Sequence, residues 1–116
     1  MSAVLWPVTC RIVKALNTAN GIDMFNDDAG GHEAAMRLLK VTEEAGEASA
    51  AYIGMTGQNP RKGTTHTTAD VADELCDVII AAAVALHCFT VAPAAALEAK
   101  LHAAARRLNA IPEHAA

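Results

Sequence analysis

The sequence is poor in aromatic residues, which make up only 3% of its 116 residues. It also lacks the alternating runs of β-branched and aromatic residues that strands need, so a β-sandwich is not expected. Alanine supplies much of the 53% hydrophobic content. Because alanine combines the best helix propensity with little bulk, this composition favours closely approaching helices. We therefore expect an all-α fold with a single domain, 1–116, which is a common size for one core.

Positive charge is scarce. The formal net charge is −4, and Lys and Arg form no basic stripe along the chain. Affinity for nucleic-acid polymers depends on clustered cations that neutralise phosphates, so no polymer partner is expected. A single nucleotide needs far fewer cations, particularly when a metal ion supplies them, and the charge balance therefore does not exclude it.

Cysteine pairs and long apolar runs are also missing. Cys10, Cys76 and Cys88 form no CxxC motif, and their odd number favours a reducing compartment. The first residues lack the positive region of a secretory signal. The unbroken apolar run 78–86 is too short to span a bilayer. We expect a cytoplasmic protein with no membrane partner.

Helix breakers and capping residues divide the chain into four predicted helices. Gly57 is a natural helix stop, and Thr67 or Thr68 is a natural N-cap. Short loops favour antiparallel neighbours, hence a four-helix bundle, and the thin alanine-rich core favours completion as a homodimer or homotetramer. The expected helices cover about Pro7–Ala19, His32–Met55, Thr68–Cys88 and Pro93–Pro112.

Acidic residues recur at helical spacing in two of these segments. Glu44 and Glu47 lie three apart in one, and Glu74 and Asp77 lie three apart in the next, so each pair shares a helix face. A helical wheel places Glu44 just inside the border of an apolar stripe and Glu47 just outside it, and Glu74 and Asp77 hold matching positions on the next helix. The stripes are Val41, Ala45, Ala48, Tyr52 and Met55 on the first helix, and Val71, Leu75, Val78, Ala82 and Phe89 on the second.

Four carboxylates beside one apolar seam need a counter-charge, because acids that share a site cannot all remain ionised without a cation. No Lys or Arg occurs between Lys62 and Lys100 to supply it. Oxygen-only ligands select Mg²⁺, Mn²⁺ or Ca²⁺ rather than zinc. Di-iron bundles use a Glu-x-x-His motif, which is absent here. A solvated acidic face is the simpler alternative.

These residues resemble the hallmark of the MazG-like all-α nucleoside triphosphate pyrophosphohydrolases, which is E-E-x-x-E on one helix and E-x-x-D on the next. The chain matches all five acidic positions, and the similarity in character covers about half of its length. The matching residues are Glu43, Glu44, Glu47, Glu74 and Asp77.

The resemblance implies an oligomeric helical bundle that uses Mg²⁺, with Mn²⁺ as a substitute, to cleave a nucleoside triphosphate into a monophosphate and pyrophosphate. Glu44, Glu47, Glu74 and Asp77 would be the metal ligands and catalytic residues. Glu43 would have a supporting role, because on the wheel it faces away from the stripe.

Residues outside the motif supply further candidates. Lys40, Arg61 and Lys62 are candidates for phosphate binding, although Lys40 could simply pair with Glu44 and the other two lie in a Pro/Gly-bounded loop. Fewer residues are candidates for stacking on a nucleobase, and each of them could instead be an ordinary core or loop residue. They are Trp6, Phe25 and His32.

Three readings therefore remain open. The chain is a nucleotide pyrophosphohydrolase that cleans the nucleotide pool, or a phosphoribosyl-ATP pyrophosphohydrolase-like relative; it is a catalytically silent nucleotide- or metal-binding regulatory module; or it is a structural bundle. Retention of all five motif acids favours the first.

Overall fold

A computed structural model describes residues 3–22 and 27–109, and the described residues form helices with no strand. The four helices in the described ranges are α1 (Leu5–Ala19), α2 (Asp27–Thr56), α3 (Thr68–Leu86) and α4 (Pro93–Arg107). The predicted all-α class is confirmed. Phe25 and the stretch beyond Asn109, where the fourth predicted helix was to fade, lie outside the described residues.

The ends of α2 and α3 that face the connecting loop follow local chemistry. Gly57, just past α2, has a φ of +67°, a conformation that costs glycine little. Thr67 caps α3: its hydroxyl accepts from the N–H of Asp70 at 3.2 Å, and its own N–H donates to the Asp70 carboxylate at 2.8 Å. These bonds also lower the pKa of Asp70. Both predicted boundaries are confirmed.

Two predicted boundaries differ from the structure. Helix α2 begins at Asp27 rather than His32, so part of the predicted glycine-rich loop is helical. Acidic residues are favoured in the first turn of a helix, and two of them begin this segment of the sequence. Helix α3 ends at Leu86, and the chain continues as a tight turn in which Cys88 N–H donates to the Ala85 carbonyl at 2.9 Å.

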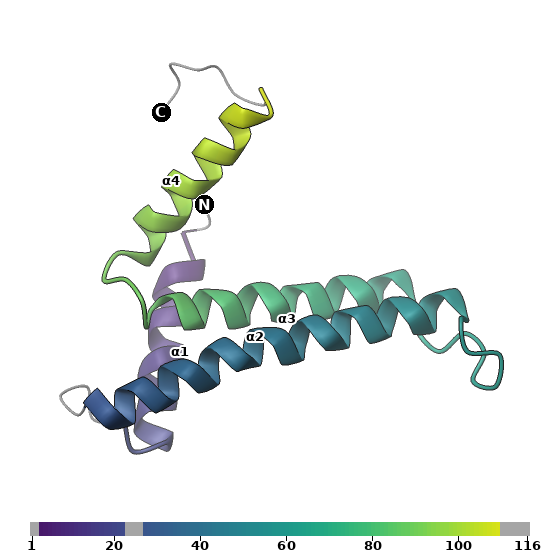
Figure 1. Ribbon diagram of the computed structural model, residues 1–116, viewed down its shortest axis with the longest axis horizontal. Helices are drawn as coiled ribbons and strands as arrows, with labels where there is room; N and C mark the ends of the chain where they lie inside the picture. The colour runs from purple at the N-terminus through teal and green to yellow at the C-terminus, as the bar shows by residue number, and fades with distance from the viewer. Residues whose placement is uncertain (1–2, 23–26, 110–116) are drawn as a thin grey trace.

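Helices α2 and α3 form a long antiparallel hairpin, and α1 crosses it near the end where α2 begins and α3 finishes (Figure 1). Side chains fix this crossing. The Thr9 hydroxyl lies 3.0 Å from His87 Nε2, and the ring of Trp6 packs edge-on against His87 with centroids 5.9 Å apart. Helix α4 projects away from the hairpin, so one chain does not close into the expected bundle.

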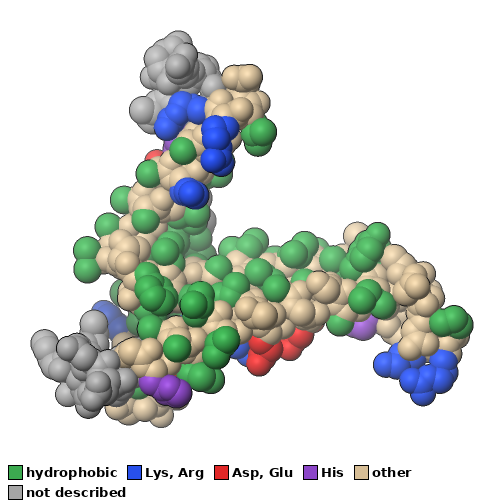
Figure 2. Space-filling model, in the orientation of Figure 1, with side chains coloured by type: hydrophobic (Ala, Val, Ile, Leu, Met, Phe, Trp, Pro, Cys, Tyr) green, Lys and Arg blue, Asp and Glu red, His purple; other side chains and the backbone are tan. Residues whose placement is uncertain are grey.

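The buried core is small. It consists of Ala48 and Ala51 on α2 and the run 83–85 on α3, with Thr9 and Arg37 as buried polar residues. The radius of gyration is 17.6 Å, whereas a compact domain of this size has about 13 Å. Much apolar surface stays exposed along the hairpin (Figure 2). The molecule is thus an open arrangement of helices.

The predicted apolar stripes are only partly buried. Ala48 is buried, but Tyr52, Leu75 and Phe89 are at least half exposed. Ala51, which lay outside the predicted stripe, is buried instead. The small residues meet between α2 and α3, while the larger ones border the contact and face outward. Within the described residues no helix is long and apolar enough to cross a membrane.

Candidate metal centre and adjoining cavity

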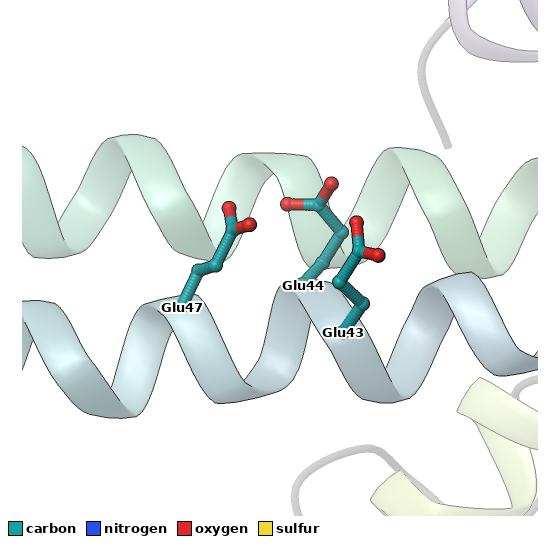
Figure 3. A group of neighbouring side chains, drawn as sticks. All are labelled: Glu43, Glu44 and Glu47. Carbon is teal, nitrogen blue, oxygen red and sulfur yellow. The ribbon is translucent and has the colours of Figure 1, made fainter.

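Glu44 connects the acids of the two helices. One carboxylate oxygen from each of Glu43, Glu44 and Glu47 lies within 4.8 Å of the others on α2. Oxygens from Glu44, Glu74 and Asp77 form a second group with the same limit, and this group joins α2 to α3. Figure 3 shows the three α2 side chains extending from the helix in the same direction. The predicted convergence of both motifs is therefore present.

Local packing explains this convergence. The acid-x-x-acid spacing puts two carboxylates on one face of each helix. Ala48 and Ala51, one and two turns after Glu44, are buried in the contact with α3. Side chains this small let two helices approach closely. The neighbouring Glu44 and Glu74 are consequently half-buried at the seam, while Glu47 and Asp77 remain exposed at its edge.

The electrostatics of the group are unfavourable for carboxylates alone. The Glu44 side chain is 13% exposed, and Oε2 of Glu44 and Oε2 of Glu74 are both buried without a hydrogen-bond partner among the described residues. Buried charged oxygens left in this way are costly. The Glu44 carboxylate, partial loss of water and then Glu74 raise the pKa of Glu47. A bound cation would remove each of these costs.

The donor set fits a hard divalent cation. All five side chains offer carboxylate oxygens, which are the ligands that Mg²⁺, Mn²⁺ and Ca²⁺ prefer. Oε2 of Glu44 and Oε2 of Glu74, which accept no hydrogen bond from the part of the chain that the structure describes, are the atoms best placed to coordinate one. Glu43 is different, because it is exposed and pairs with Lys40.

Lys40 supplies the nearest positive charge. Its ammonium group pairs with Glu43 and lies 3.2 Å from Oε1 of Glu44. Hydrogen bonds from Lys40 to these two carboxylates, that to Glu43 first, raise the pKa of the lysine. The side chain is half exposed, so it is not locked in this position. The predicted pairing with Glu44 is confirmed, and reach to a phosphate stays a prediction.

A cavity of about 410 Å³ adjoins the acids. Its volume is within the range of small-molecule sites, roughly 300–1,000 Å³. Helices α1, α2 and α3 all contribute to it. Its polar lining consists of Lys40, Glu44 and Asp77 beside the acids and of Glu33 and Arg37 further along α2; its apolar lining consists of Ile12, Leu16, Met36, Ile80, Ala81 and Val84.

Sequence reasoning missed Arg37, which is 7% exposed. Its guanidinium donates to Oε1 of Glu33 at 3.2 Å, to Oδ1 of Asn17 at 2.6 Å and to the sulfur of Cys88 at 3.7 Å. The only local signal is the Glu33/Arg37 pair four residues apart. The partners on α1 and after α3 are distant in sequence, so no pattern along the chain could have revealed the network.

Several predicted residues lie away from this site. Arg61 and Lys62 are exposed in the loop at the tip of the hairpin. Helix α2 continues for nine residues after Glu47 before this loop, or about 14 Å along the axis. Figure 2 shows the basic tip apart from the acidic patch. Neither Trp6, which packs on His87, nor His32, which is exposed, lines the cavity.

Comparisons with known proteins add no relative. No protein-family model matches the chain, and no curated protein or solved structure matches it.

Proposed function

We propose that the protein is a Mg²⁺-dependent nucleoside triphosphate pyrophosphohydrolase of the MazG-like all-α type. The observation that carries this proposal is the Glu44-centred carboxylate group with its two unpartnered buried oxygens, directly beside a cavity of about 410 Å³. A metal-chelated triphosphate needs carboxylates at one end, and a nucleoside needs a largely apolar cavity.

The residues then divide the work. Glu44, Glu47, Glu74 and Asp77 would hold Mg²⁺, which when bound neutralises phosphate charge and acidifies water. Lys40, at the border of the acids and the cavity, would contact a phosphate oxygen. Water attacks the α-phosphorus, the bond from that phosphorus to the bridging oxygen breaks, and pyrophosphate leaves. Glu47 or another carboxylate of the group accepts the proton of the water.

Homo-oligomerisation belongs to the same proposal. A groove of about 370 Å³ lies on the hairpin, and Tyr52, Ile53 and Leu75 form its exposed apolar part. On the helical wheel Tyr52 is about 140° from Glu47, so this groove is on the other side of α2. A second copy that covers it would complete the thin core and leave the acids accessible to nucleotide.

The test is a panel of ribo- and deoxyribonucleoside triphosphates, including modified bases, incubated with Mg²⁺. We expect pyrophosphate and monophosphate from at least one of them. Release of single phosphate would show a different reaction. Tight binding without turnover at high enzyme concentration would favour the silent binding module instead.

A further inference from the structure

The polar residues that line the cavity fall into two regions. Lys40, Glu44 and Asp77 form one region, and Glu33 and Arg37 form the other. Glu33 precedes Glu44 by eleven residues on α2, which corresponds to about 16 Å along the helix axis. A ligand with phosphates at the first region therefore places its other end near the second.

The Glu33 carboxylate is held in position. Its Oε1 accepts from Nδ2 of Asn20 at 2.8 Å and from Nε of Arg37 at 3.2 Å, and the side chain is 13% exposed. Arg37 directs its remaining donors largely at protein atoms, namely Oδ1 of Asn17 and the sulfur of Cys88. Of the two polar side chains in this part of the cavity wall, Glu33 is therefore the one that can bind a ligand. Its carboxylate accepts hydrogen bonds.

We propose that Glu33 selects nucleotides whose base carries an exocyclic amino group over nucleotides whose base has a carbonyl at the same place. This inference rests on the proposed function, because it assumes that the phosphates bind beside Glu44. An amino group donates a hydrogen bond to the carboxylate, whereas a carbonyl oxygen presents a second acceptor and leaves both unpaired. Cytosine and uracil differ in this way and have nearly the same shape.

A purely structural role for Glu33 makes a different prediction. If the carboxylate only neutralises the buried Arg37, bases of equal shape bind equally well. The affinity ratio between a cytosine and a uracil nucleotide therefore separates the two roles in the unmodified protein, whether or not a variant folds.

The experiment uses dCTP and dUTP analogues with a methylene group between the α- and β-phosphorus, which cannot be cleaved there. Calorimetric titration with Mn²⁺ present gives their affinities without any turnover. We expect the wild type to bind the dCTP analogue about tenfold more tightly or better. Glu33→Gln should bring the ratio to within about twofold, because an amide can donate as well as accept. Glu98→Gln on α4, 62% exposed, is the matched control and should keep the wild-type ratio.

A second variant tests whether the base binds in this cavity. Ile80→Trp fills the apolar wall, so it should weaken both analogues while Mn²⁺ binding persists; unchanged analogue binding would overturn the assignment. Equal affinities in the wild type would also overturn it and would leave the proposed function standing. If neither analogue binds to the wild type with Mn²⁺, this inference fails, while the panel of nucleoside triphosphates decides separately whether the proposed function stands.

Discussion

The two sides of the α2–α3 hairpin differ in chemistry and in how far the rest of the chain covers them. One side carries Glu44, Glu47 and Asp77 next to an open cavity that is lined by three helices of the same chain. The other carries exposed large apolar residues such as Tyr52 and Ile79, which nothing in the described chain covers. Helical geometry places the acids on one side of the seam and Tyr52 and Ile79 on the other.

The largest effect expected is on the acidic side. Glu47→Ala or Asp77→Ala should reduce pyrophosphate release by about a thousandfold or more, because each removes a ligand of the proposed metal. Without metal the Glu47 variant should melt no lower than the wild type, since the deletion relieves the repulsion that raises the pKa of Glu47. Melting curves with and without Mn²⁺ should show a smaller metal-dependent gain in both variants.

Asp73→Ala is the matched control for this pair, because Asp73 is an exposed acid of α3 outside both carboxylate groups. It should keep most of the activity and most of the metal-dependent gain. Equal gains in the wild type and all three variants would mean that Glu47 and Asp77 share no site.

The next effect concerns the apolar side. Leu75 lines the proposed interface and is 50% exposed, and Leu75→Lys places a charge where the second copy is proposed to pack. Light scattering should show the wild type as a dimer or tetramer and the variant as a smaller species. Leu101→Lys on α4 is the control and should leave the mass unchanged. A wild type that is monomeric at micromolar concentration would contradict the proposed interface.

A smaller effect separates the loop end of the hairpin from its middle. Gly57→Ala should cost about 1–2 kcal/mol of unfolding free energy, because φ is +67° there and a Cβ would lie 3.1 Å from the Thr64 hydroxyl oxygen. Gly46→Ala should instead stabilise α2 by up to about 1 kcal/mol, since nothing lies within 4 Å of its added Cβ. Urea unfolding measures both. A stabilising Gly57→Ala together with a destabilising Gly46→Ala would contradict this interpretation of the two glycines.

The smallest effect is at the crossing of α1. Partial burial, and then the charge of Arg37, lower the pKa of His87. Its folded pKa is below the unfolded value of about 6.5, so its contribution to stability is present above that pH and is lost as pH falls through the folded pKa. The wild type should melt lower at about pH 5 than at about pH 7, and His87→Gln should flatten this dependence. His32→Gln, at an exposed histidine, should keep the wild-type slope.

Local chemistry explains which features the sequence predicts. Gly57 and the Thr67–Asp70 cap act within a few residues, so both ends of the loop are predictable. The helical wheel also places Glu44 deeper in the seam than Glu47, as the structure shows. Periodicity alone is enough for such statements, because the two acids lie on one regular helix.

Tertiary contacts explain what the sequence does not predict. Arg37 reads as an ordinary helical cation, and only its bonds to Asn17 and Cys88 show that it is buried in a wall of the cavity. The wheel assigns Tyr52 to the core because it is apolar, yet the small side chain of Ala51 occupies the contact instead. The pattern of a single helix indicates an apolar face. It does not indicate whether another helix of the same chain or a second molecule covers that face.

The position of the loop between the two acid pairs has a consequence for insertions and deletions. The chain reverses direction after Gly57 and re-enters a helix at Thr68, well beyond both carboxylate groups. Residues added within this loop lengthen the tip and leave the acids in register. One residue added within α2 between Glu44 and Glu47 rotates everything on one side of it by about 100°, which separates these two carboxylates. Homologous sequences should therefore differ in length between the motifs and agree in spacing within each.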